Sequence, residues 1–307
     1  MSETPGAPSA TTLDIMLPYY GDVALMQAAV HSILAQSDPN WRLTVVDDGK
    51  EPDVPGWFAQ LGDPRVSYQR NEQNLGVTGN YRKCIGLVRE EHFVMMGTDD
   101  IMLPEYVATV RALLAEHPGI GMIQPGVQVI DGDGKPTDGL VDQSKRLLYT
   151  PKVRGRLLMG GERLAVSLLR GNWLYFPAMC WRTDAVRKAG LRDNLEVTQD
   201  LALEIDLVQA GEQMLVTDTV CFQYRRHAVS ISSQQAFTGK RFAEANRFFM
   251  EVADRLDAQG WTKAAKASRL HLSSRIHALT MVPGALKNKQ SEGTRTLLRH
   301  AVGADHR

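Results

Sequence analysis

The sequence predicts an α/β fold in which a mostly parallel sheet is flanked by helices. Between about residue 13 and residue 130, short apolar runs rich in β-branched residues alternate with stretches whose apolar residues recur at helical spacing. Two of the runs end in paired aspartates, Asp47–Asp48 and Asp99–Asp100. Ligands of doubly wound sheets bind at the carboxyl ends of the strands. The same pattern therefore predicts both the fold class and the position of a candidate site.

The elements of the first half follow from apolar spacing and from the residues that end each run. A proline, glycine or aspartate stops the apolar runs, and Pro104 suits the first turn of a helix. The expected strands are 13–17, 43–46, 93–96 and 122–130, and the expected helices are 26–34, 80–89 and 104–117.

The second half is less regular, and we expect it to shape the acceptor side. The expected elements are a polar surface loop over 135–156, strands over 177–181 and 214–224, helices over 183–190 and 200–210, and a helical region from about 234 with a break at Pro283–Gly284. The predicted organisation is a disordered tail (1–11), one domain (12–232, with halves 12–130 and 131–232) and a helical extension (233–307).

Composition excludes several classes of protein. Thirty-five basic residues balance thirty-five acidic ones, so nothing points to nucleic acid. The three cysteines stand far apart in apolar runs, which indicates buried thiols. We find neither a signal-peptide pattern nor an apolar run of about 18 residues. We therefore expect a cytoplasmic protein.

The paired aspartates are candidates for a cation site. Adjacent carboxylates repel each other unless a cation lies between them, and Mg²⁺ or Mn²⁺ commonly joins carboxylates to substrate phosphates. Each pair taken alone is more typical of a solvated turn with a capping aspartate. Asp200 opens a helix, where it is either an N-cap or a general base on a rigid element. Arg225, Arg226 and His227 end a strand and suit phosphate or metal contacts, or a solvated basic turn.

Taken together, six short motifs resemble family 2 glycosyltransferases with the GT-A fold. The motifs are Leu17–Tyr20, Val45–Gly49, Asn74–Gly76, Thr98–Asp100, Gln199–Asp200 and Tyr224–His227. Each is short, but their joint order and spacing over about residues 12–232 are specific. The resemblance implies a Rossmann-like GT-A domain that transfers a sugar, with inversion, from a nucleoside-diphosphate sugar (UDP-, dTDP- or GDP-linked) to an acceptor hydroxyl.

On the donor side, the resemblance implies a nucleotide pocket at the ends of the first strands. Asp48 is expected to hold the nucleobase. Pro18 and Tyr19 are expected to contact the nucleotide-sugar, with Tyr19 against the base. Asn74 and Gly76 match the N-x-G motif of the family and are expected to shape this pocket.

For the chemistry, the resemblance implies that Asp99 contacts the ribose or the sugar and that Asp100 ligates Mn²⁺ or Mg²⁺ on the diphosphate. Asp200 matches the catalytic base of the family. His227 matches a histidine that completes the metal shell in some members, and Arg226 is expected to reach the diphosphate.

The chain also departs from the family pattern. Gly79 precedes Asn80 where many members carry Arg, so this chain lacks that Arg on the donor side. Gly21 replaces a frequent Asn, Lys50 a frequent Ser, and Gln199 the usual Glu before the base.

Two other functions stay open at this point. A sugar nucleotidyltransferase can share this strand order, but it usually needs a Gly-rich, basic loop after the first strand, which residues 18–22 do not provide. A non-catalytic nucleotide-sugar-binding module is the other, and the presence of Asp100, Asp200 and His227 argues against it.

The acceptor is expected to be a glycan or a lipid-linked glycan, in polysaccharide or glycolipid biosynthesis. Asn172 and Trp173 are candidate wall residues, although Trp173 is equally typical of buried packing. Residues 261–307 carry nine basic residues and two acidic ones among interleaved apolar residues. Such a segment can bind an anionic membrane surface, pack on the catalytic domain, or form a homodimer contact.

Overall fold

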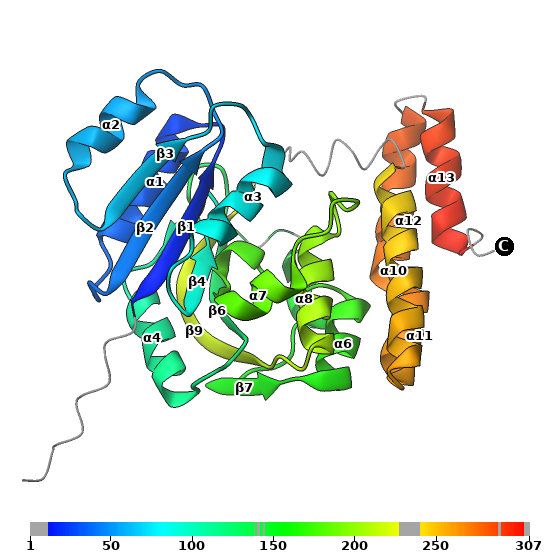
Figure 1. Ribbon diagram of the computed structural model, residues 1–307. Helices are drawn as coiled ribbons and strands as arrows, with labels where there is room; N and C mark the ends of the chain where they lie inside the picture. Colours follow the sequence, from blue (N-terminus) through cyan, green and yellow to red (C-terminus); the bar gives the residue numbers. More distant parts are fainter. Residues whose placement is uncertain are drawn as a thin grey trace, which may run out of the picture.

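The computed structural model describes residues 12–137, 139, 142–143, 145–226, 240–287 and 290–303. These residues form a mixed sheet with helices on both faces and a helical C-terminal region (Figure 1). The strands are β1 (Leu13–Tyr19), β2 (Trp41–Asp47), β3 (Val66–Arg70), β4 (His92–Met95), β5 (Ile101–Met102), β6 (Met122–Ile130), β7 (Arg156–Met159), β8 (Cys180–Arg182) and β9 (Met214–Arg225). The helices are α1 (Val23–Leu34), α2 (Val54–Leu61), α3 (Gly76–Leu87), α4 (Tyr106–Glu116), η1 (Lys145–Tyr149), α6 (Gly161–Arg170), η2 (Phe176–Ala178), α7 (Thr183–Ala189), α8 (Gln199–Gln209), α10 (Lys240–Ala258), α11 (Thr262–Leu270), α12 (Leu272–Lys287) and α13 (Ser291–Val302).

The strands lie in the order β3-β2-β1-β4-β8-β6-β9-β5, and β7 pairs with β9. The four strands β3, β2, β1 and β4 are parallel to one another, and β6 is parallel to β9. The remaining pairs are antiparallel. The predicted α/β class is confirmed, and the parallel half brings the carboxyl ends of β1, β2 and β4 to one edge.

The sheet is buried on both faces, which explains why its strands are continuous apolar runs. Along β1, Leu13, Ile15 and Leu17 pack with α1, α2 and α4, whereas Met16 faces α3 and the helices of the second half. These strand side chains are at most 1% exposed. The two cores hold the strand ends, and therefore the candidate site residues, on a rigid frame.

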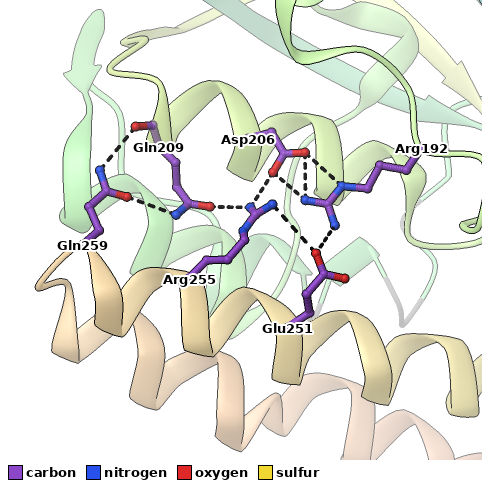
Figure 2. Close-up of polar contacts among 6 residues, drawn as sticks. All are labelled: Arg192, Asp206, Gln209, Glu251, Arg255 and Gln259. Carbon is purple, nitrogen blue, oxygen red and sulfur yellow. Dashed lines mark hydrogen bonds and ion pairs between the residues drawn. The ribbon is translucent and has the colours of Figure 1, made fainter.

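The helical C-terminal region packs against the second half. Phe248, Phe249 and Val252 of α10 lie in the same core as α6 and α8. A polar network joins α8 to α10: Arg192 contacts both Asp206 and Glu251, and Arg255 contacts Asp206 (Figure 2). No helix within the described ranges is long and apolar enough to cross a membrane.

Several sequence-based expectations for local structure were wrong. Helix α12 runs through Pro283 instead of breaking there. Pro283 is exposed, so the carbonyl that it leaves unpaired lies near solvent, and tertiary packing of the helix outweighs the lost bond. Residues 177–181 are not one strand, because Pro177 lies within the 3₁₀ turn η2 that precedes β8. The expected loop 135–156 contains the π-helical turn η1. The predicted tail 1–11 lies outside the described residues.

Candidate active site

Asp48, at the end of β2, organises the loop that leads into α3. Its carboxylate is 5% exposed and accepts hydrogen bonds from the backbone N–H groups of Leu75 (2.8 Å) and Gly76 (3.0 Å). Asn74 bridges the same loop, because its amide donates to the Asp48 carbonyl and its Oδ1 accepts from the Gly76 N–H. Gly76 has φ 68°, a conformation that favours glycine. Asp48 therefore fixes the shape of the pocket, and most of its acceptor capacity is already used.

Asn71 and Asn80 extend this arrangement, and the sequence analysis did not assign them. The Asn71 amide donates to Asp48 Oδ1 (2.7 Å) and to Asn80 Oδ1 (3.2 Å), and Lys83 Nζ donates to Asn71 (2.7 Å). Asn80 in turn donates to the Val46 carbonyl. Asn80 is 3% exposed. The signal available in the sequence was the presence of two asparagines, one shortly before α3 and one within it.

Tyr19 and Tyr20 lie on opposite sides of the β1 end. Tyr19 is fully buried, and its hydroxyl donates to the Gly21 carbonyl at 2.9 Å. Burial, helped by the charges of Glu51 and Asp47, raises the pKa of Tyr19 to about 12. Tyr20 is 67% exposed, and Pro18 is partly exposed. The exposed aromatic ring at this strand end therefore belongs to Tyr20 and not to Tyr19.

Asp99 and Asp100 follow β4 and are pinned by Arg225 at the end of β9. The Arg225 N–H donates to Asp100 Oδ1 at 2.8 Å, and its guanidinium donates to the Asp99 carbonyl at 2.7 Å. The same guanidinium donates to the Asp131 and Gly132 carbonyls, so it holds the end of β6 as well. Arg225 has a structural role that the sequence analysis missed.

The second oxygen of Asp100 fits a cation. Asp100 is 1% exposed, and its Oδ2 has no hydrogen-bond partner among the described residues. Burial, and next the charge of Asp99, raises the pKa of Asp100 well above its ordinary value. Gly97 leaves space for this oxygen, because a Cβ there would lie 2.5 Å from it. A buried, unpaired carboxylate oxygen is costly unless a cation compensates it.

A complete metal cage is absent from the part of the chain that the structure describes, since no group of three His, Cys, Asp or Glu side chains could hold an ion there. Mg²⁺ is usually held by one or two carboxylates with substrate phosphates supplying further ligands, so this finding is compatible with a cation held together with a donor. His227, the second predicted ligand, lies outside the described residues.

Asp200 joins the same site from α8. It is exposed, in the first turn of that helix. Burial and then the charge of Asp200, with smaller contributions from Asp100 and Asp99, raise the pKa of the Tyr81 hydroxyl. Burial, with the same three carboxylates among the other causes, raises the pKa of Tyr224 to about 12. We call Asp99, Asp100 and Asp200 the acid cluster. Two segments that are remote in sequence, residues 99–100 and the start of α8, thus bring carboxylates within electrostatic range of the same two tyrosines.

Arg226 points to the acceptor side. Its Nε donates to Asp142 at 3.1 Å, and Asp142 also accepts from the Tyr175 hydroxyl at 3.2 Å. Asp142 is 6% exposed. Asp142, Trp173 and Tyr175 line a cavity of about 630 Å³ that runs along β6 and β9. Asp142 therefore belongs to the wall of this cavity, and Arg226 contacts that wall residue.

The predicted acceptor residues are turned into the protein. Asn172 donates to Glu204 Oε2 at 2.9 Å and accepts from the Leu174 N–H at 3.0 Å. Trp173 is 2% exposed, and its Nε1 donates to Ser167. Trp173 reaches the cavity wall only as part of the buried core, as the packing alternative predicted. Tyr175, two residues further along the chain, also lines the cavity and is less buried than Trp173.

Comparison with known proteins decides the family. The sequence model of Glycosyl transferase family 2 matches residues 14–169, just over half of the chain. This chain belongs to glycosyl transferase family 2. The glycosyltransferase is 29% identical over 245 residues to the uncharacterized protein MT1568 of Mycobacterium tuberculosis, an alignment that covers 76% of this chain and 73% of the relative.

Two further relatives carry glycosyltransferase names. The putative teichuronic acid biosynthesis glycosyltransferase TuaG of Bacillus subtilis is 20% identical over 232 residues, covering 75% of this chain and 84% of TuaG. The crystal structure of Staphylococcus aureus TarS residues 1–349 in complex with UDP-GlcNAc superposes with a TM-score of 0.57 at 13% identity, over 96% of this chain and 91% of that one. The structural similarity to TarS shows that this glycosyltransferase shares the TarS fold.

Proposed function

We propose that this enzyme transfers a sugar from a nucleoside-diphosphate sugar to an acceptor hydroxyl in a single, inverting displacement. The acid cluster carries the proposal, because it unites a buried carboxylate oxygen that has no partner among the described residues (Asp100) with an exposed carboxylate on a helix start (Asp200). Family membership and the TarS complex with UDP-GlcNAc support a nucleotide-linked donor. UDP-, dTDP- and GDP-sugars are the candidates.

The nucleotide is proposed to lie over the loop that Asp48 organises. The preorganised N–H groups and amides around Asp48, Asn74 and Gly76 give that pocket a fixed shape. Tyr20 offers its exposed ring to the base, and Pro18 forms the adjacent wall. Asp99, partly exposed beside Asp100, is placed to accept a hydrogen bond from a ribose or sugar hydroxyl.

Asp100 is proposed to hold Mn²⁺ or Mg²⁺ jointly with the donor diphosphate, and His227 is a second candidate ligand. When bound, the cation would neutralise the charge that grows on the departing diphosphate. Arg225 holds Asp100 in place through its backbone N–H, and its guanidinium, directed at backbone carbonyls, leaves Oδ2 available.

Asp200 is proposed to act as the general base. Its carboxylate takes the proton from the acceptor hydroxyl while that oxygen forms a bond to the anomeric carbon, and the bond from that carbon to the diphosphate oxygen breaks. Such proton transfer is typically worth about 10²–10⁴-fold in rate. Asp200 lies in the first turn of α8, so its carboxylate is carried on a helix and not on a loop.

The acceptor is proposed to bind in the cavity along β6 and β9. Asp142 and Tyr175 are hydrogen-bonded to each other on its wall, Arg226 donates to Asp142, and Gln124 and Gln128 add further polar atoms to the wall. Aromatic and polar groups in one cavity suit a sugar ring. The names of the relatives, which include teichuronic acid biosynthesis, support a role in polysaccharide or glycolipid biosynthesis.

We also propose that the enzyme is cytoplasmic and binds peripherally to the inner face of the membrane through α12. Helix α12 faces the C-terminal core with Ala278 and Ala285, with Met281 and Val282 packed beside them, whereas four other large apolar residues of the helix are exposed. These residues are Leu272 (60% exposed), Ile276 (48%), Leu279 (51%) and Leu286 (61%). The last three lie 4, 7 and 14 residues after Leu272, the first residue of the helix, so all four form one stripe along it.

The charge of this region favours an anionic lipid surface as the partner. Lys287 adjoins the stripe, and Arg295 and Arg299 are exposed on α13, which packs beside α12. The excess of basic residues over 261–307 has the sign that anionic lipids attract. A second copy of the chain is the alternative occupant of the stripe.

Turnover of the Asp200→Asn variant tests the proposed chemistry. We expect the release of nucleotide in the presence of acceptor to fall by about 10²-fold or more, with donor affinity unchanged, because Asn cannot accept the proton. Asp142→Asn is a matched control that alters the acceptor wall and should change the acceptor KM more than kcat. An Asp200→Asn enzyme with wild-type turnover would refute the role of Asp200 as base.

A further inference from the structure

Glu244, in the first part of α10, binds the segment that immediately precedes the proposed base. Its Oε1 accepts hydrogen bonds from the N–H groups of Val197 (2.9 Å) and Thr198 (3.0 Å) and from the Thr198 hydroxyl (3.0 Å). Its Oε2 accepts from the Glu196 N–H at 3.1 Å. One carboxylate therefore satisfies four donors on three consecutive residues, and the next residues along the chain are Gln199 and Asp200.

Thr198 shows that this contact replaces an ordinary helix cap. It occupies the N-cap position of α8, yet its side chain makes no capping bond to the helix. A threonine at this position ordinarily accepts from an N–H of the first turn. Here its hydroxyl donates outward to Glu244 instead. The entry into α8 is thus fixed from another part of the chain, 46 residues away in sequence.

The carboxylate is held in its ionised form. Burial alone would raise the pKa of Glu244, but the hydrogen bonds from residues 196–198 outweigh it and leave the pKa lowered. Charge-assisted bonds to backbone N–H groups are stronger than neutral ones. The contact is therefore suited to fixing the direction of the first turn of α8 at neutral pH.

The two ends of α8 are held differently. The network of Figure 2 contacts Asp206 and Gln209, two turns or more beyond the start of the helix. Asp206 is six residues from Asp200, which is about 9 Å along a helix. Glu244 is the contact at the catalytic end, and the network is the contact at the far end. Both come from α10.

We propose that Glu244 is a positioning residue for Asp200, so that the helical C-terminal region takes part in catalysis by setting the place of the base. The inference rests on the proposed function, in which Asp200 accepts the acceptor proton. A base displaced by about 1 Å can cost on the order of 10²-fold in rate, so a modest shift of the first turn of α8 is sufficient.

The test compares Glu244→Gln and Glu244→Ala with Arg255→Ala in the full chain. In Glu244→Gln the amide nitrogen would face a backbone N–H, so one oxygen has to serve all donors. Arg255→Ala removes the far-end contacts of α10 with Asp206 and Gln209 and leaves Glu244 intact. Turnover is measured as release of UDP from UDP-GlcNAc, or of the nucleotide from a dTDP- or GDP-sugar if that donor binds more tightly. Donor affinity is measured by calorimetry with UDP and Mn²⁺.

We expect kcat to fall by about 10- to 100-fold in both Glu244 variants, with unchanged affinity for the nucleotide and partial recovery in Glu244→Asp. Amide exchange at residues 196–200 should accelerate in Glu244→Gln, while exchange at 206–209 accelerates only in Arg255→Ala. The inference would be overturned if the kcat of Glu244→Gln were no lower than that of Arg255→Ala. It would also be overturned if the loss of kcat in the Glu244 variants paralleled a loss of thermal stability or of nucleotide affinity. If Asp200→Asn is inactive while the Glu244 variants are fully active, only the positioning role is refuted. An active Asp200→Asn enzyme would instead refute the base itself and, with it, the positioning role.

Discussion

The backbone N–H of Arg225 donates to Oδ1 of Asp100 at 2.8 Å, while Oδ2 of the same carboxylate is buried without a partner among the described residues. One oxygen thus fixes the side chain and the other is left for a ligand. The strand order of the sheet makes this possible, because β9 ends beside the loop that follows β4 through its pairing with β5. Asp100 is therefore fixed in a position where its buried carboxylate is electrostatically unfavourable as long as no cation is bound.

Replacing Asp100 with Asn should not destabilise the metal-free enzyme. Asn keeps an oxygen for the Arg225 N–H and removes a buried charge beside Asp99, so we expect the free energy of unfolding to stay equal or to rise by about 1 kcal/mol. Urea denaturation measures this value. The variant should also lose any stabilisation by Mn²⁺ with UDP. A loss of more than about 2 kcal/mol would instead assign Asp100 a structural role.

Tyr20, and not Tyr19, should determine the affinity for the nucleotide. Tyr20→Ala removes the exposed ring and is expected to weaken UDP binding by about tenfold, the effect of a lost stacking contact worth ~1.4 kcal/mol. Tyr19→Phe removes only the hydroxyl that donates to Gly21, so it should cost about 1 kcal/mol of stability and leave binding unchanged. Calorimetry with UDP compares both. The reverse ranking would restore the sequence-based assignment of Tyr19.

Binding to anionic vesicles should depend on the outward stripe of α12. The double variant Ile276→Gln/Leu279→Gln is expected to lose flotation with phosphatidylglycerol vesicles, and raised salt should weaken binding of the wild type because the attraction is partly electrostatic. Val220→Gln, at a residue 52% exposed on β9, is the matched control. Equal flotation of all three proteins would contradict the proposal. A concentration-dependent dimer that the double variant abolishes would assign the stripe to a second copy.

Stability should fall in acid partly through His92. This histidine is 3% exposed, its Nε2 lies 3.1 Å from the Ile120 carbonyl, and burial lowers the pKa of His92 below 6.5. The unfolded chain therefore takes up a proton at a higher pH than the folded chain, and stability decreases as the pH falls below 6.5. His92→Gln should flatten the dependence of unfolding free energy on pH between 7 and 5. His31→Gln, at an exposed position, is the control; an identical effect of both would contradict the prediction.

Much of the fold follows from the sequence, because buried parallel strands such as β1 and β2 are continuous apolar runs between turn residues. The motifs likewise located Asp100 and Asp200 at a strand end and a helix start. What the sequence could not show was which atoms are already bonded. The Asp48 carboxylate accepts hydrogen bonds from backbone N–H groups, Tyr19 is buried in the core, and the Asn172 amide donates to Glu204.

Long-range relationships were also beyond the sequence. The link between Glu244 and residues 196–198 joins two segments whose local patterns are ordinary, a helix and a turn. The continuation of α12 through Pro283 depends on packing against α10 and α13, which overrides local propensity. In each case the outcome depends on a tertiary contact between segments that are distant in sequence.

The most direct test of the central claim is calorimetric titration of UDP-, dTDP- and GDP-sugars, with and without Mn²⁺, into the wild type and Asp100→Asn. We predict that one donor binds the wild type only when Mn²⁺ is present, and that this binding is lost in the variant. Failure of every donor to show metal-dependent binding to the wild type, or equal binding to Asp100→Asn, would contradict the assignment of Asp100 and the metal-assisted transfer proposed for this site.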